Sequence, residues 1–262
     1  RFNDQSTGGN NARFYGVGAC ILVTNGGLDI TDTVIRTLTV GGNAIFAYNE
    51  LSTINVSDSN ISTSYDESSG LHVADGGTIN SLNNTVVIGT GISEKSSAIR
   101  VDKGGGTITA NGGDYNTYGP KSPAIFCTKG NVEVSNAQII AASSELVSIE
   151  GSGTVSLDNV VAAFNNSDSE DGYDYGICMY QATNLITDSG KCVFDCSNSV
   201  ITSRNGGLFY VTNIEAEINM SRTNVSTLNI YDFLLRCTGN SNVKDWGAGR
   251  NNGGKCTLNM NR

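Results

Sequence analysis

The stretch Ser122-Pro-Ala-Ile-Phe-Cys-Thr-Lys-Gly-Asn-Val-Glu-Val-Ser-Asn-Ala-Gln-Ile139 contains the unit that is repeated along this chain. It opens with a small residue followed by an aliphatic residue (Ala124-Ile125), continues with an alternating phrase (Val132 to Val134), and passes a polar corner before Ile139. The aliphatic residue of the opening phrase recurs at positions 45, 71, 99, 125, 147, 177, 208 and 235, in steps of 22 to 31 residues. A period in this range is typical of repeat architectures, in which no unit can bury its apolar side alone.

Each repeat contains three short apolar phrases separated by polar corners. Alternation of apolar and polar residues over four or five positions indicates a strand with one buried face, and no helical spacing competes with it. The corners align at Asp32, Asp58, Asn83, Asn111, Asn136, Asp158 and Asn198. The third apolar points are Val34, Ile61, Val87, Ile139, Val160, Val200 and Val225. We therefore expect an all-β fold, a single-stranded right-handed parallel β-helix of about nine coils with three short strands per coil.

The pattern also predicts how the chain is divided. We expect a flexible lead-in over residues 1–12 and a β-helix domain over residues 13–262. Within that domain, residues 165–175 form an acidic insertion, and residues 240–254 form an irregular Gly/Asn-rich terminal loop. Because residue 1 is Arg, we expect a mature form or an excised piece of a longer protein.

The amino-acid composition limits the classes of molecule that this protein is expected to bind. The net charge of −9 argues against nucleic acid or anionic membrane as partners, since phosphate binding needs clustered Lys and Arg. No apolar run approaches the ~20 residues needed to cross a bilayer, so we expect no membrane insertion. The acidic, Asn/Thr-rich composition predicts an extracellular or cell-surface location, with a glycan or a protein on a host or neighbouring cell as partner.

The seven cysteines do not have the spacing of a zinc site. Cys127 and Cys237 occupy the same inward position of the repeat, which favours small buried hydrophobic side chains. A disulfide such as Cys237–Cys256 is left open, because pairing cannot be inferred from spacing.

The first strand of each coil presents the one surface where aromatic and charged residues occur together. The inward set is predicted as Ile45, Leu71, Ile99, Ile125, Val147, Ile177, Leu208 and Leu235. The outward neighbours are then Phe46, His72, Arg100, Phe126, Ser148, Cys178, Phe209 and Arg236, and a second outward row is Tyr48, Ala74, Asp102, Thr128, Glu150, Tyr180, Val211 and Thr238.

These outward rows predict a ligand groove. The exposed aromatic residues Phe46, Tyr48, Phe126 and Tyr180 could stack against sugar rings. Arg100, Asp102 and Glu150 offer hydrogen bonds to hydroxyl groups. The alternative is that outward aromatic residues simply favour strands and that opposite charges pair between coils.

An enzyme on the same face would use Asp102, Glu150, His72 and Arg100. The two carboxylates lie two coils apart, so their backbones are about 9 to 10 Å apart, near the window of about 6.5 to 9.5 Å for inverting glycosidases. His72 is the only histidine, and its neighbour Arg100 disfavours its protonation. This set is weak evidence for catalysis.

The acidic insertion contains four carboxylates around Gly172. Its candidate calcium ligands are Asp168, Glu170, Asp171 and Asp174, but the order of ligands in an EF-hand loop is not met. A solvated acidic loop is favoured over a metal site, and we expect no cofactor.

Phrases such as Ser122–Ile139 and Gly153-Thr-Val-Ser-Leu-Asp-Asn-Val160 resemble the right-handed parallel β-helix, or pectate-lyase-like, superfamily. The chain is closest in character to the adhesin-like repeat proteins of bacterial and archaeal cell surfaces. The resemblance implies a fold but no activity, because the superfamily includes polysaccharide lyases, polygalacturonases, tailspikes and adhesins. The Asn-Thr-Asp, Asp-Asp, Gly-His-Gly and Arg-Ile-Lys motifs of polygalacturonases are absent, so no catalytic residue can be transferred.

The leading interpretation is a non-enzymatic surface recognition protein that binds glycan or protein along the first-strand face. The alternatives are a polysaccharide-degrading lyase or hydrolase with its site on that face, and a structural stalk or spacer. The unpaired strand edges at the ends of a β-helix also leave end-to-end self-association open.

Overall fold

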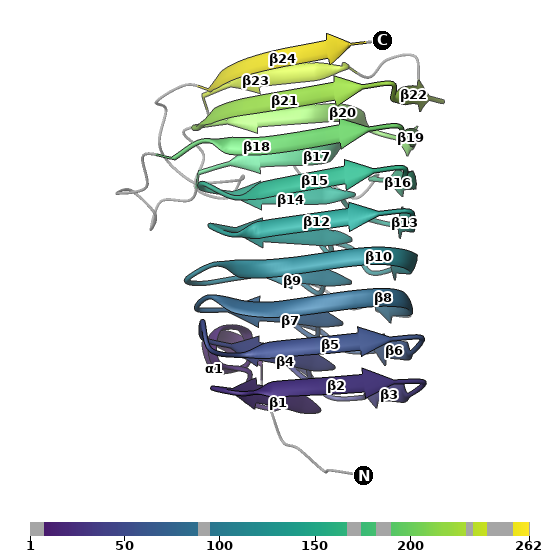
Figure 1. Ribbon diagram of the computed structural model, residues 1–262. Helices are drawn as coiled ribbons and strands as arrows, with labels where there is room; N and C mark the ends of the chain where they lie inside the picture. Colours follow the sequence, from purple (N-terminus) through teal and green to yellow (C-terminus); the bar gives the residue numbers. More distant parts are fainter. Residues whose placement is uncertain are drawn as a thin grey trace.

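The computed structural model describes residues 8–88, 95–166, 174–181, 190–228, 233–239 and 254–261. Within them the chain winds into a parallel β-solenoid whose coils stack from the N-terminal to the C-terminal end (Figure 1). The expected all-β parallel β-helix is therefore confirmed, while its right-handed sense and its count of nine coils remain predictions. No helix in the described part of the chain is long and apolar enough to span a membrane.

The first strands of the coils form one parallel sheet of nine strands in the described residues. Its members, in stacking order, are β1 (Ile21–Thr24), β4 (Ile45–Tyr48), β7 (Leu71–Ala74), β9 (Ile99–Val101), β11 (Ile125–Thr128), β14 (Val147–Glu150), β17 (Tyr175–Tyr180), β20 (Gly207–Thr212) and β23 (Leu235–Thr238).

The second and third strands of the coils form the other sheet. The second strands are β2 (Gly27–Thr31), β5 (Thr53–Ser57), β12 (Asn131–Ser135), β15 (Thr154–Asp158), β18 (Cys192–Ser197), β21 (Glu215–Ser221) and β24 (Lys255–Asn261). The third strands are β3 (Val34–Thr37), β6 (Asn60–Thr63), β13 (Gln138–Ala141), β16 (Val161–Asn165), β19 (Val200–Asn205) and β22 (Asn224–Thr227). Two long strands, β8 (Gly77–Ile88) and β10 (Gly106–Thr117), continue through the corner and supply both positions of their coils.

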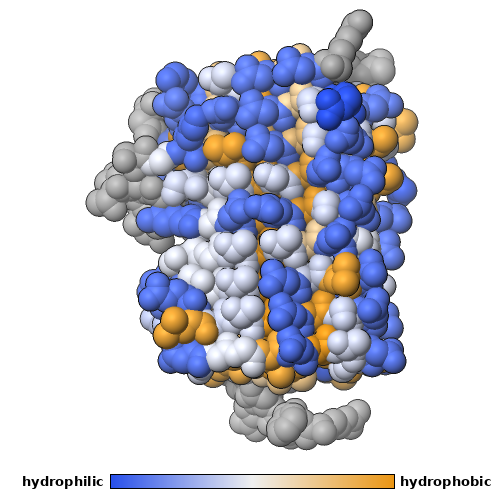
Figure 2. Space-filling view, in the orientation of Figure 1, coloured by the Kyte–Doolittle hydropathy of each residue, from blue (hydrophilic) through white to orange (hydrophobic). Residues whose placement is uncertain are grey.

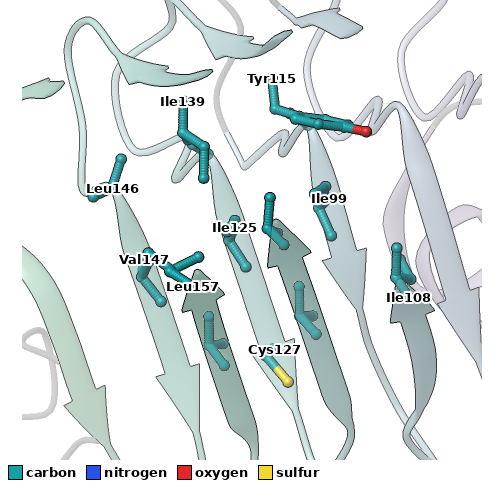
Figure 3. Packing of buried hydrophobic residues seen from close by; sticks show 14 of the residues in the cluster. Ile99, Ile108, Tyr115, Ile125, Cys127, Ile139, Leu146, Val147 and Leu157 are labelled. Carbon is teal, nitrogen blue, oxygen red and sulfur yellow. The ribbon is translucent and has the colours of Figure 1, made fainter. Parts of the chain in front are cut away.

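The inward rows fill the solenoid. Ile99, Ile125 and Val147 are fully buried on successive first strands and point into the same interior as Tyr115 and Ile139 (Figure 3). The face made by the second strands is largely hydrophilic or of intermediate hydropathy, as expected for strands with one wet side (Figure 2).

The strand register confirms the predicted inward row as far as residue 177 and corrects it in the next coil. Ile177 pairs with Phe209, not Leu208, so Phe209 faces inward and Tyr210 outward. Phe209 is fully buried beside Phe194, with ring centroids 5.9 Å apart.

In three coils the buried residue of the third strand also lies one position away from the predicted one. Val34, Val87 and Val200 face outward, and their neighbours Ile35, Val86 and Ile201 are the buried residues.

The polar corner between the second and third strands is a side-chain ladder. Its residues adopt positive φ, at 51° in Asp58 and 53° in Asn136 and Asn198, a conformation that Asn and Asp tolerate best after Gly. Asn136 donates to Asn111 Oδ1 at 2.8 Å, and Asn159 donates to Asn136 Oδ1 at 2.8 Å. In two coils the left-handed residue is one position later than predicted, at Gly112 and Asn159 in place of Asn111 and Asp158.

A short helix, α1 (Gly9–Tyr15), lies where the sequence predicted part of a flexible lead-in. Its C-cap is Gly16, whose φ of 68° is left-handed. A Cβ on Gly16 would lie 2.8 Å from the Phe46 ring, so only glycine permits this close approach. Residues 1–7 lie outside the described residues.

The two predicted irregular segments also fall mainly outside them. Asn165 ends β16 and Tyr175 begins β17, and Asn166 Nδ2 donates to the Tyr175 carbonyl at 2.9 Å, which joins the two ends of the acidic insertion. Asp168, Glu170 and Asp171 are not described, and of the terminal loop only Gly254 is.

All seven cysteines are described, and no two of them form a disulfide. Cys127 is buried as expected, whereas Cys237 is exposed because its coil is the last in its sheet. The disulfide left open between Cys237 and Cys256 is not formed.

Candidate functional site

The outward side of the first strands is mostly covered, in contrast to the exposed groove that the sequence predicted. Phe46 and His72 are fully buried, and Arg100, Phe126 and Ser148 are between 1 % and 8 % exposed. Side chains that stand outward from the sheet therefore form a second layer packed beneath other parts of the chain.

Helix α1 covers the N-terminal part of this face. Phe46 packs against His72 with ring centroids 4.2 Å apart, and Tyr15 of the helix contacts Tyr48 at 5.8 Å. Phe46 and Tyr48, which were predicted to bind ligand, instead pack beneath and beside this helix. The correction has a simple cause, since outward aromatic residues need a cover and a neighbouring segment provides it.

His72 is held in its neutral form in this layer. Burial, and then the charge of Arg100, places its pKa well below the usual value. Its Nδ1 lies 3.1 Å from Asn43 Oδ1, while Nε2 has no hydrogen-bond partner in the described residues. The predicted effect of Arg100 on its protonation is supported, and His72 does not line the cavity described next.

One cavity opens in the covered face, over the first strands of the central coils. It has a volume of about 320 Å³, near the lower end of the range for small-molecule sites. We call it the first-strand pocket. Its lining residues are Arg13, Lys95, Arg100, Lys121, Pro123, Phe126, Glu145, Ser148, Glu150 and Tyr180.

Four residues of the predicted ligand set therefore line one cavity: Arg100, Phe126, Glu150 and Tyr180. They come from β9, β11, β14 and β17, which are consecutive in the sheet. The structure brings them together because the same outward positions of stacked parallel strands lie in rows.

Arg100 lines the pocket and forms an ion pair with Asp102 behind it. The two residues are two apart on β9 and its extension, so both side chains point outward from the sheet. Arg100 Nε lies 2.8 Å and one terminal nitrogen 2.7 Å from Asp102 Oδ2. The guanidinium also stacks over the Phe126 ring at 4.3 Å and donates to the Lys95 carbonyl at 3.2 Å. This side chain is fixed in position by groups on two successive coils.

Asp102 is committed to this ion pair and does not line the pocket. Burial by itself raises the pKa of Asp102, but the charges of Arg100 and Arg13 outweigh it, so the net shift is downward. Arg13 of α1 lies 3.7 Å from the same carboxylate oxygen and thereby ties the helix to this site.

The pKa values of the two glutamates in the pocket are shifted in the opposite direction, upward. Burial raises the pKa of Glu145, although Ser144 donates a hydrogen bond to its carboxylate. Burial and the charge of Asp102 raise the pKa of Glu150, which accepts a hydrogen bond from Thr128 Oγ1 at 3.2 Å. Both carboxyl groups thus hold a proton more readily than a glutamate in water.

Ser148 is the unexplained polar group of the pocket. It is 1 % exposed, and its Oγ has no hydrogen-bond partner in the part of the chain that the structure describes. Few buried hydroxyls in folded proteins are left in this state, and a site with such an orphan is one where a ligand or water would be held.

Sequence reasoning missed six of the lining residues. Lys95 and Lys121 could have been found, because each lies four residues before the aliphatic residue of its coil. Ser148 was placed in the correct row but given no role. Arg13, Pro123 and Glu145 carried no signal, since α1 and the loops before β11 and β14 were not predicted to meet there.

Of the weak calcium set, only Asp174 is described. In the described residues no group of three His, Cys, Asp or Glu side chains is placed to hold a metal ion.

The fold and this site define a parallel β-solenoid with a covered lateral face and a small charged pocket in it. The chain matches no protein-family model, no curated protein and no solved structure.

Proposed function

We propose that this chain is a non-enzymatic recognition protein of the extracellular space or cell surface, with adhesin-like character, that binds a glycan on its first-strand face. The first-strand pocket holds one saccharide unit of that glycan. Its size, its two hydroxyl groups and its fixed charged groups suit a ligand rich in hydroxyl groups. The observation that carries this proposal is the buried, unpartnered Ser148 hydroxyl in a cavity bordered by Tyr180 and Glu150.

A glycan array tests the proposal. Tyr180→Ala removes an aromatic wall of the pocket, and we expect the signal of bound glycans to fall at least about tenfold. Tyr118→Ala is the matched control, because Tyr118 is 42 % exposed and lies outside the pocket. Equal signals from both variants would place the binding site elsewhere, and no signal from wild-type protein would favour the stalk or spacer.

A polysaccharide-degrading enzyme is the second candidate, and one observation favours it. The pKa of Glu150 is raised while that of nearby Asp102 is lowered, the arrangement that separates a general acid from a base. Against it, Asp102 is 4 % exposed and bound to Arg100. Release of reducing ends or unsaturated products by wild-type protein, abolished in Glu150→Gln, would establish the enzyme in place of the recognition protein.

A further inference from the structure

Helix α1 is attached to the first-strand face by few contacts. Ala12 is its one buried residue, and a helix of seven residues is too short to be stable by itself. At its start the Gly9 amide donates to the Glu67 carboxylate, and further along Arg13 lies 3.7 Å from Asp102. A segment with so little buried surface opens at a lower free energy than the core of the fold.

A further contact couples this helix to His72. Asn43 Nδ2 donates to the Ala12 carbonyl of α1 at 3.1 Å, and Asn43 Oδ1 lies 3.1 Å from His72 Nδ1. Because an amide oxygen can only accept, Nδ1 carries the proton of the neutral ring and Nε2 is left as an acceptor. Nε2 has no hydrogen-bond partner in the described residues, and the His72 side chain is fully buried.

The ring therefore cannot be protonated favourably while α1 is in place. A proton on Nε2 would create a charged donor in a buried position where no described group accepts from it. The charged groups that face the ring in the described residues are Arg100 and Asp102, at and just after β9, and Arg13 of the helix; Phe46, which packs on it from β4, is uncharged. Displacement of α1 lets water reach the ring, so the open form is the one that binds the proton.

We propose that helix α1 is a cover of the first-strand face that is released when His72 takes up a proton. Its release uncovers Phe46 and separates Tyr48 from Tyr15, which extends the first-strand pocket toward the N-terminal coils by two aromatic rings. The inference rests on the proposed glycan recognition and names how that site is regulated, with longer glycans bound more tightly in mildly acidic solution.

Titration of His72 by NMR is the first test. His72 is the only histidine, so its imidazole gives one set of proton resonances. Gly16→Ala loosens the cover, because the added Cβ would lie 2.8 Å from the Phe46 ring at a φ of 68°; Gly26→Ala is the matched control, since a Cβ there would have no atom within 4 Å. We expect the lowered pKa of His72 to rise toward that of an exposed histidine, about 6.5, in Gly16→Ala alone. An unchanged pKa in Gly16→Ala, or an equal rise in Gly26→Ala, would overturn the proposal.

Hydrogen exchange followed by mass spectrometry measures the opening itself, without any ligand. After correction for intrinsic exchange rates, opening of α1 in the wild-type protein should increase by up to about tenfold per pH unit below about pH 6.5, while β11 stays protected. His72→Asn keeps a donor for Asn43 but takes up no proton, so its opening should not depend on pH. The same increase in His72→Asn, or exchange of β11 in step with α1, would contradict release by His72.

The glycan array at about pH 5 and about pH 7.5 connects the opening with binding. We expect glycans of several units to give a stronger signal at the lower pH, and Gly16→Ala to give the stronger signal at both. Opening of α1 that leaves the signals of bound glycans unchanged would overturn its regulatory role. No glycan signal at either pH, with the opening still observed, would overturn the proposed glycan recognition and leave the acid release of α1 supported.

Discussion

Replacing Arg100 by Met tests the central ion pair of the first-strand face. The variant removes the guanidinium nitrogens that now lie 2.7 and 2.8 Å from the Asp102 carboxylate, which is 4 % exposed and keeps only Arg13, at 3.7 Å, as a cationic neighbour. Breaking a buried pair in this way costs about 3–5 kcal/mol. Loss of the cation–π contact with Phe126 at 4.3 Å adds up to about 2 kcal/mol, which the apolar Met side chain partly restores. We therefore expect the free energy of unfolding to fall by about 3–5 kcal/mol.

Urea unfolding followed by far-ultraviolet circular dichroism measures this loss of unfolding free energy. Two further variants show whether the loss comes from the buried ion pair. Arg100→Met/Asp102→Asn removes the buried negative charge as well and should recover at least about 2 kcal/mol relative to the single variant. Arg36→Met, on an exposed arginine of β3, should change stability by no more than about 0.5 kcal/mol. A loss below about 1 kcal/mol in Arg100→Met, or a double variant worse than the single one, would refute the reasoning.

Three further predictions concern other parts of the chain. Because the pKa of His72 is lower in the folded protein than in the unfolded chain, the unfolded chain takes up the proton first as the pH falls. The stability of the wild-type protein should therefore fall below about pH 6.5, by at most about 1.4 kcal/mol per pH unit from this group. Unfolding measured as a function of pH should lack this component in His72→Phe. Asn136→Ala should lower the free energy of unfolding by about 2–4 kcal/mol, because it removes two side-chain hydrogen bonds of the ladder and places Ala at a left-handed backbone position. Asn136→Gly should lose only the contribution of the hydrogen bonds, since glycine adopts positive φ without strain. Equal losses for the two variants in urea unfolding would argue against backbone strain at this corner. The exposed residues Cys20 and Cys237 should react with a thiol reagent in the folded protein. Cys127 is buried, and burial raises the pKa of its thiol to about 12, so it should react only after unfolding. Immediate reaction of Cys127 would contradict its buried position.

The repeat could be predicted because its signal is local and occurs many times. Alternation within each phrase assigns inward and outward residues, and the step between phrases assigns stacked neighbours. This alternation places Arg100, Phe126, Glu150 and Tyr180 in neighbouring rows, and in the structure all four line one pocket. The same reasoning failed at residue 208, where two apolar residues in succession allow either register. There, Tyr210 stacks on Tyr175 with centroids 5.2 Å apart and Phe209 fills the interior.

The covering layer could not be predicted, because its signal is not local. Helix α1 has seven residues, begins with Gly-Asn-Asn and is too short to be stable alone. It forms where Ala12 is buried and Gly16 approaches Phe46, contacts that exist only once the coils have stacked. Phe46 therefore had an outward position in the sequence pattern but a buried one in the molecule.

The sequence by itself determined the period, the strands and most of the polar corners and inward positions, because each of these follows from the alternation of neighbouring side chains. Tertiary structure alone decided which outward residues are reached by solvent. Burial by segments distant in sequence hides Phe46 and His72, and it leaves Ser148 without a hydrogen-bond partner in the described residues. It also brings Lys95 and Lys121 to one small pocket, so the charge and burial that give this face its chemistry arise only when the coils are stacked and covered.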